Sequence, residues 1–216
     1  NSIHEAPIKL NNFSKNYLIK TTGYNKDKII DLAGGRGSDL FNYRLANIKK
    51  LLYMEIDKDA IDELLFRKYK FDNPNGTAIN IINSDLTAPY KKNLSLIQED
   101  FAEFNKVDNI YCFFALHYLT GNLANIKNIV CLISQLLNKD GEFIYTAFDE
   151  NKIIDLLKKN KGKWEVKEAN IRKYSIIQKY KDKDLFKNIK LILPFNTPDY
   201  YYDEVLINEK ILDKEF

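Results

Sequence analysis

A glycine-rich turn is the first segment of this sequence that can hold a small ligand. Ala33-Gly34-Gly35-Arg36-Gly37-Ser38-Asp39 follows an apolar run and precedes Leu40–Leu45, which can begin a helix. Consecutive glycines let the backbone turn sharply and let a ligand approach without meeting a Cβ atom. The glycine spacing differs from the dinucleotide-binding pattern, and no Lys-Ser or Lys-Thr pair follows it, so the sequence disfavours a phosphate-binding loop.

Carboxylates follow the next two apolar runs. Glu55 ends the second run, where an acid can accept hydrogen bonds from both hydroxyls of a ribose, and Asp85 follows the third, within reach of an adenine edge. An adenosine site without a phosphate-binding loop indicates S-adenosylmethionine. The positive sulfonium charge of this cofactor suits a crevice lined by carboxylates. Each feature alone has a simpler interpretation, because such glycines are often mere turns and such acids often cap helices. Their occurrence together at successive strand ends favours the ligand site.

Strand-length and helix-length segments alternate through the first two thirds of the chain. We predict strands at Lys28–Ala33, Leu51–Ile56, Thr77–Ile82, Val107–Leu116 and Glu142–Ala147, and helices at Asp59–Lys70, Leu94–Phe104 and Leu123–Leu137. This order predicts a Rossmann-like α/β fold, in which a mostly parallel, twisted sheet is covered on both faces and opens its ligand crevice at the carboxyl ends of the strands. From Lys163 the pattern changes to short alternating runs, which predicts an antiparallel addition after the fifth strand.

The composition is that of an ordinary folded chain, with 45% hydrophobic and 29% charged residues among 216, and we expect a single domain. No apolar run approaches the ~18 residues that a membrane span needs. Asn1–Lys20 lacks the pattern of a signal peptide, while the missing first Met indicates a processed or shortened chain. The net charge of +3 is too small to indicate nucleic-acid binding by itself, so an RNA partner must be recognised locally.

The two cysteines, Cys112 and Cys131, each lie in an apolar segment without a second Cys or His at metal-binding spacing. We expect two buried thiols without a chemical role and no metal site. This cysteine usage fits a reducing, intracellular compartment, cytoplasmic or nuclear, which includes the cytoplasmic replication site of a virus.

Four segments together resemble mRNA cap guanine-N7 methyltransferases. Leu10–Ile19 is similar to the family's F-N-N-W-x-K-like helix, and Ile30–Leu40 to its D-L-G-C-G-K-G-G-D-L loop. Cys112–Tyr118 resembles the C-Q-F-x-x-H-Y strand, and Tyr202–Ile207 looks like the stretch that contains the family's glutamate. The resemblance covers nearly the whole chain in the family's order. It implies a class I methyltransferase that uses S-adenosylmethionine to methylate N7 of the guanine at the 5′ end of capped RNA.

The resemblance also implies roles for individual residues. Lys15 would hold the cofactor carboxylate, Glu55 its ribose and Asp85 its adenine. The residues implied for the cofactor are Lys15, Asp31, Ala33, Gly35, Asp39, Glu55, Asp85, Leu86, Phe113 and Tyr118, and those implied for the cap are Asn11, Asn12, Arg36, Arg67, His117 and Glu204. Both arginines would neutralise cap phosphates. Guanine N7 carries a free lone pair, so we expect no catalytic acid or base, and Asp39, His117 and Glu204 would position the reactants.

The chain departs from the family pattern at several points. Phe113 stands where the family has a cofactor-contacting Gln, Ala33 replaces its first loop Gly, and Gly34 replaces its Cys. We expect 1–150 to form the cofactor-binding core, 163–203 an antiparallel substrate-side insertion, and 204–216 the start of a C-terminal helix, with Glu204–Leu212 helical. The family's C-terminal strand pair, with its cap-contacting Tyr, has no counterpart before Phe216, which implies a shortened chain or strands supplied by another chain.

Simpler interpretations compete with the functional ones. His117 can be a core histidine, Arg67 can pair with Glu63 on one helix face, and Asn11 and Asn12 can cap a helix. The run Lys158, Lys159, Lys161 and Lys163 can be merely solvated or can follow RNA phosphates. The alternatives for the whole chain are a methyltransferase for another nucleobase or a small molecule, and a non-catalytic scaffold subunit of a capping complex. Other capping-enzyme domains and a stimulatory subunit are the further partners that the resemblance implies.

Overall fold

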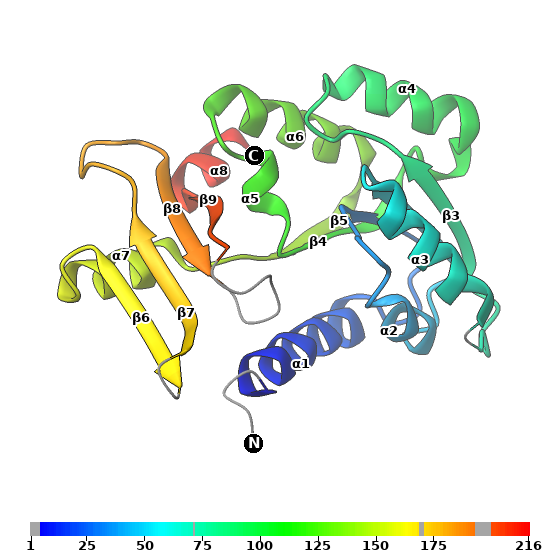
Figure 1. Cartoon of the computed structure of the whole chain (residues 1–216). Coiled ribbons are helices and arrows are strands. Elements are labelled where there is room, and N and C mark those ends of the chain that lie inside the picture. Colours follow the sequence, from blue (N-terminus) through cyan, green and yellow to red (C-terminus); the bar gives the residue numbers. More distant parts are fainter. Residues whose placement is uncertain (1–4, 71, 169–170, 193–199) are drawn as a thin grey trace.

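A five-stranded parallel sheet forms the centre of the protein (Figure 1). The computed structural model describes residues 5–70, 72–168, 171–192 and 200–216, without the side chains of residues 5–7 and 171. The strands are β1 Lys28–Leu32, β2 Lys50–Glu55, β3 Ala78–Asn83, β4 Val107–Phe113 and β5 Leu137–Thr146, in the order β3-β2-β1-β4-β5. All four neighbouring pairs are parallel, which confirms the predicted Rossmann-like sheet.

Helices cover both faces of this sheet because its strands are apolar on both faces. The helices of this part are α1 Glu5–Thr22, α2 Leu40–Leu45, α3 Lys58–Lys70, α4 Tyr90–Asp100, η1 Ala102–Phe104, α5 Leu116–Leu119 and α6 Leu123–Leu136. Ile30 and Leu32 of β1 point into the core shared with α4 and α6, whereas Ile29 points into the core shared with α1, α2 and α3. Within the described ranges, no helix combines the length and apolar character needed to cross a bilayer.

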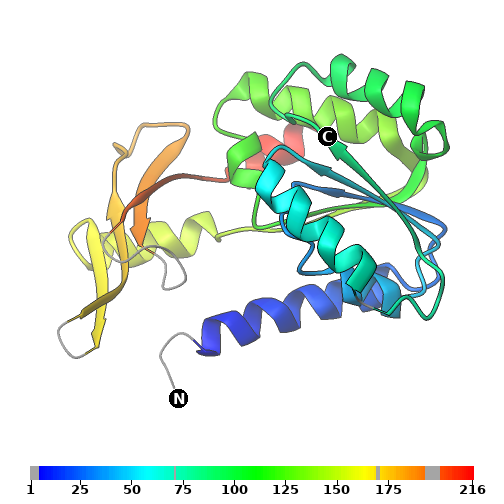
Figure 2. The ribbon, with the colours of Figure 1, turned by 45° about the vertical axis from the view of Figure 1, so that its right-hand side comes forward.

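A second sheet follows the fifth strand, as predicted from Lys163 onward. After α7 Glu150–Lys159, the strands β6 Lys163–Glu168, β7 Ile171–Gln178, β8 Lys187–Ile192 and β9 Tyr202–Leu206 pair antiparallel in sequence order, and α8 Glu209–Glu215 ends the chain. Helix α7 packs on one face of this antiparallel sheet through Leu157, against Ile189 and Leu191. Figure 2 shows the antiparallel sheet to one side of the parallel one, with the N-terminal end of α1 pointing toward it.

The sequence prediction is wrong at several points, including the start of β5 at Leu137 and the range of α4, which ends at Asp100. Glu204 is not helical: it lies in β9 opposite Ile189, and the helix begins only at Glu209, after the Asn208 side chain caps it. The alternation of buried Glu204 and Leu206 with more exposed neighbours is that of a strand. Strand β4 stops at Phe113, because Phe114 has a left-handed φ of +52°. Cys131 is exposed, since it lies beside rather than on the apolar stripe of α6, whereas Cys112 is buried as expected and burial raises the pKa of its thiol.

The glycine turn after β1 supplies a first testable prediction. Gly35 and Gly37 both have positive φ, +55° and +68°, but a Cβ at Gly35 would meet open space whereas one at Gly37 would collide with the Leu64 side chain. Gly37→Ala should therefore cost about 2–4 kcal/mol, from left-handed strain plus overpacking, and Gly35→Ala only about 1–2 kcal/mol. Urea unfolding of both variants checks this, and equal losses would contradict the packing argument.

Candidate active site

A cavity of about 720 Å³ lies between α1, the segment after β4 and one face of the antiparallel sheet. Its lining includes six residues implied by the sequence: Asn11, Asn12, Lys15, His117, Tyr118 and Glu204. Ser38 of the glycine turn also reaches it. Segments that lie far apart in the sequence, in α1, after β1, after β4 and in β9, therefore meet around one space.

A buried ion pair joins α1 to the glycine turn at this cavity. The Lys15 ammonium lies 2.6 Å from Asp39 Oδ2 and donates to Ser38 Oγ at 3.2 Å. Lys15 is 7% exposed and Asp39 8% exposed, so each charge depends on the other for its solvation. The Lys15 side chain is thus fixed beside the cavity, with one of its three donor hydrogens outside these two contacts.

Glu55, at the end of β2, accepts a hydrogen bond that holds the same turn in place. Its Oε2 accepts from the Gly35 N–H at 2.7 Å, while Oε1 accepts from the N–H groups of Ile56 and Asp57 at 2.8 and 2.9 Å. The carboxylate therefore organises the turn and the start of α3 together. Ala33, at the start of the turn, has a φ of +53°, a conformation that favours glycine and that costs an alanine about 1–2 kcal/mol.

Eight of the ten residues implied for the cofactor, all except Lys15 and Tyr118, are not among the described residues that line the cavity. Asp31 is buried in β1 and accepts from the Tyr43 hydroxyl at 3.1 Å. Asp85 is exposed after β3, and hydrogen bonds from the Thr87 hydroxyl and N–H lower the pKa of its carboxyl. Leu86 packs in the core, and the Phe113 ring lies 5.5 Å from that of Tyr111.

Asp31 gives a prediction about stability and pH. Burial, followed by the nearby charge of Asp39, raises the pKa of Asp31 well above its ordinary value, although the Tyr43 hydrogen bond opposes the shift. A raised pKa in the folded state means that folding stability falls as pH rises above the ordinary carboxyl pKa of about 4. Asp31→Asn should therefore be more stable than the wild type at pH 8, and the difference should shrink as the pH falls toward 4. Urea midpoints at several pH values measure this, and a variant less stable at every pH would show that the ionised carboxylate is net stabilising.

His117, Tyr118 and Glu204 line the cavity as a second group, from the segment after β4 and from β9. His117 Nε2 lies 2.7 Å from Glu204 Oε2, although the two atoms are not aligned as a hydrogen bond, so both keep hydrogen-bonding capacity for a ligand. The Tyr118 hydroxyl donates to Glu204 Oε1 at 3.3 Å. Burial and the Glu204 charge raise the pKa of Tyr118 to about 12, so its phenol stays neutral at physiological pH.

The two arginines implied for the cap phosphates lie elsewhere. Arg67 Nε is 3.0 Å from Glu63 Oε1, four residues earlier on α3, as in the simpler interpretation of this residue. Arg36 is exposed in the glycine turn. Neither belongs to the described lining of the cavity.

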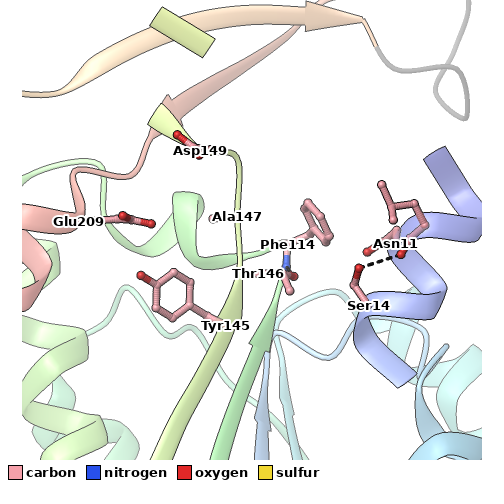
Figure 3. Close-up of a pocket in the computed structure, with 9 residues that line it drawn as sticks. Asn11, Ser14, Phe114, Tyr145, Thr146, Ala147, Asp149 and Glu209 are labelled. Atoms are coloured by element: carbon pink, nitrogen blue, oxygen red, sulfur yellow. Dashed lines mark hydrogen bonds between the residues drawn. The ribbon is translucent and has the colours of Figure 1, made fainter. Parts of the chain in front are cut away.

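Phe114 is a cavity residue that no sequence motif singled out. This residue is 37% exposed and lines both the main cavity and a second one of about 550 Å³. Figure 3 shows it between the end of β5, at Thr146, and Asn11 and Ser14 of α1. The left-handed backbone that turns its ring outward has no signature in an apolar run, so only its aromatic type could have suggested it. Trp164, Tyr174 and Tyr202 of the antiparallel sheet also line the main cavity and were not predicted.

The parallel sheet, its glycine turn and the acid at the end of β2 define a Rossmann-like S-adenosylmethionine-dependent methyltransferase fold. An S-adenosylmethionine-dependent methyltransferase from Clostridium acetobutylicum superposes with a TM-score of 0.60 at 15% identity, over 96% of this chain and 78% of that one. CcbJ methyltransferase from Streptomyces caelestis gives a TM-score of 0.63 at 10% identity, over 95% and 83%. The chain belongs to the mRNA (guanine-N(7))-methyltransferase domain family, whose model matches residues 6–191.

Two relatives show how this domain compares with longer proteins. The mRNA-capping enzyme of African swine fever virus, strain Badajoz 1971 Vero-adapted, is 27% identical over 99% of this chain and 26% of its own length. The mRNA cap guanine-N(7) methyltransferase 1 of Arabidopsis thaliana is 30% identical over 71% of this chain and 42% of its own length. The chain thus spans about a quarter of the viral relative and less than half of the plant one. The family and its cofactor, S-adenosylmethionine, are as predicted.

Proposed function

We propose that this domain transfers the methyl group of S-adenosylmethionine to N7 of the guanine in the 5′ cap of RNA. The observation that carries this proposal is the single cavity that joins the Lys15–Asp39 pair to the His117–Glu204 pair. One end of it is suited to an amino-acid carboxylate and the other to a base with donor groups. Family membership supports the same reaction.

The residues around the turn fit the cofactor. A ligand can approach Gly35 closely, since nothing lies within 4 Å of its Cβ position, and the buried Asn11 Oδ1 in the cavity has no hydrogen-bond partner among the described residues. Lys15 would hold the carboxylate, Glu55 the ribose, and Asp85 with Leu86 the adenine. The bound cofactor supplies an electrophilic methyl group on a positively charged sulfur.

The base side of the cavity suits guanine. Glu204 can accept hydrogen bonds from the ring N1–H and the exocyclic amine, which leaves N7 free. As guanine gains positive charge during the transfer, this fixed carboxylate stabilises it more strongly than it stabilises the neutral base. The exposed Phe114 ring offers a surface on which the base can stack.

Positioning is the remaining contribution of the protein. N7 needs no general base, so the pocket has to hold the lone pair in line with the bond to the methyl group, and such alignment can supply up to roughly 7–11 kcal/mol. The Tyr118 hydroxyl donates to the Glu204 carboxylate, and His117 lies 2.7 Å from its other oxygen, so the two side chains restrict where the carboxylate can lie. They act as positioning residues.

Methyl transfer by the purified chain tests the proposal. The substrates are capped RNA, the same RNA with a 5′ triphosphate, and free GTP, with the product nucleosides identified by mass spectrometry after digestion. We expect N7-methylguanosine from capped RNA only. Methylation of a different position, or of uncapped substrates equally well, would overturn the proposal. Absence of both transfer and binding of S-adenosylhomocysteine in calorimetry would favour the scaffold alternative.

A further inference from the structure

Positive charge is concentrated in one part of the chain. Between Lys158 and Lys190 the sequence holds twelve Lys or Arg and four Asp or Glu, a net charge of +8. Because the whole chain carries +3, the rest of it is negative by five charges. Such segregation is expected where a protein meets a polyanion, since the repulsion among like charges otherwise opposes folding.

The fold gathers most of these lysines at one end of the antiparallel sheet. Seven exposed lysines, which we call the basic end, are Lys158, Lys159, Lys161, Lys163, Lys179, Lys181 and Lys183. They lie on the end of α7, the turn into β6 and the connection between β7 and β8. These segments are adjacent because the Gln178 N–H donates to the Gly162 carbonyl at 2.9 Å and Lys163 pairs with Ile177. Figure 1 shows all three on the outer side of the sheet.

The charges at the basic end are largely uncompensated. The Lys163 ammonium lies 2.9 Å from Glu165, but the ammonium groups of the other six form no ion pair among the described residues, although the Lys181 backbone N–H donates to Asp184 at 2.7 Å. Most cations elsewhere in the same sheet are paired, although Lys167 is not among them: Arg172 lies 2.8 Å from Glu165, Lys187 3.2 Å from Glu150 and Lys190 3.8 Å from Asp203. The basic end therefore differs from an ordinary salt-bridged surface.

The basic end also borders the cavity of the candidate active site. Trp164, the residue after Lys163, lines that cavity, and so does Ile176, its partner across the β6–β7 pair. Strand β6 is the edge of the antiparallel sheet, so a nucleotide chain that leaves the cavity past Trp164 would cross this edge to reach Lys163, whose side chain lies on the opposite face of the strand. This continuity favours a ligand that is partly in the cavity and partly outside it.

We infer that the basic end binds the sugar-phosphate backbone of the RNA that follows the cap, an inference that rests on the proposed function. The lysines would act as point charges without reading base sequence. The domain would then hold a capped RNA of several nucleotides more tightly than a cap dinucleotide, and the difference would fall with salt as counterions are released.

Two triple variants with the same change in net charge test this inference. The first is Lys179→Gln, Lys181→Gln and Lys183→Gln in the basic end. The control is Lys91→Gln, Lys127→Gln and Lys139→Gln, three exposed lysines on α4, α6 and β5. KM is measured for a cap dinucleotide and for a capped 20-nucleotide RNA between 50 and 200 mM salt.

The basic-end triple should raise KM for the long RNA about tenfold at low salt, and should lower the slope of log KM against log salt concentration by about 2. The KM for the cap dinucleotide should stay within about twofold of the wild-type value. The control triple should leave all values within about twofold. Equal effects of the two triples, or an effect on the dinucleotide alone, would overturn the inference while leaving the proposed function intact.

If no substrate is methylated, the proposed function fails, but the inference about the basic end can still be tested. Fluorescence anisotropy with a labelled 5′-triphosphate RNA measures binding directly, and unchanged affinity in the basic-end triple would overturn the inference.

Discussion

Asp39→Ala is expected to abolish methyl transfer, with a loss of at least about a hundredfold, and to lower the free energy of unfolding by about 3–5 kcal/mol. The stability loss follows because the change leaves the Lys15 ammonium buried without the carboxylate that lies 2.6 Å from it. The activity loss follows because Lys15 then has no fixed position beside the cavity. Urea unfolding, the rate of transfer to capped RNA and calorimetry with S-adenosylhomocysteine measure the three effects.

A double variant separates the two roles of this pair. Lys15→Met with Asp39→Leu replaces the buried ions by apolar side chains, a change that is often neutral or stabilising. We expect the double variant to recover most of the stability lost in Asp39→Ala, and to remain unable to bind S-adenosylhomocysteine or to transfer methyl groups. Recovery of activity together with stability would show that the pair is only structural and would remove Lys15 from the cofactor site.

Glu204→Gln should reduce kcat/KM for capped RNA by about 10²–10³-fold, comparable to the loss of one preorganised group that meets developing charge. The amide keeps the shape of the side chain but loses the negative charge that stabilises a cationic guanine. Affinity for S-adenosylhomocysteine should change by less than about threefold, because Glu204 contacts His117 and Tyr118 and not the Lys15–Asp39 pair proposed for the cofactor. Steady-state kinetics and calorimetry give the two numbers.

Asp203→Asn is the matched control for Glu204→Gln. Asp203 is the preceding residue of β9, but its side chain points the other way, is largely exposed and lies 3.8 Å from Lys190. The control should leave kcat/KM within about twofold. If Glu204→Gln weakens the cofactor product more than it slows transfer to the cap, Glu204 does not belong to the base pocket.

Sequence periodicity was sufficient to predict the parallel sheet and the change to antiparallel strands. The strands of the sheet, such as Lys28–Leu32, are short apolar runs bounded by turns, and the helices between them carry apolar stripes. The prediction was wrong near Glu204, because the sequence from Tyr202 to Leu212 has both a strand and a helix and the boundary depends on pairing with β8. Hydrogen bonding to a strand elsewhere in the chain does not change the local pattern of apolar and polar residues, so this pattern cannot predict it.

Only part of the candidate site could be predicted from the sequence. Motifs suggested residues such as Lys15 and His117, but the motifs could not show that Lys15 pairs with Asp39 or that His117 meets Glu204. These contacts join residues 24 and 87 positions apart, and their formation depends on how α1 and β9 pack. The outward turn of Phe114 depends on a left-handed backbone in a run that otherwise predicts a continuous strand. The roles of Arg36 and Arg67 toward cap phosphates stay predictions, since Arg67 pairs with Glu63 and neither arginine is among the described lining of the cavity.

The position of Glu204 on β9 has a consequence for how such a protein can change its acceptor. Under the proposed function, Lys15 and the glycine turn hold the methyl donor, whereas the acceptor wall combines Glu204 of the separate antiparallel sheet with Asn11, Asn12 and His117. A few substitutions along one face of β9 and its neighbours can therefore reshape the acceptor wall without disturbing the donor side. The part of the acceptor wall that β9 supplies can diverge without change at the donor side, which makes acceptor choice the more readily altered property under the proposed function.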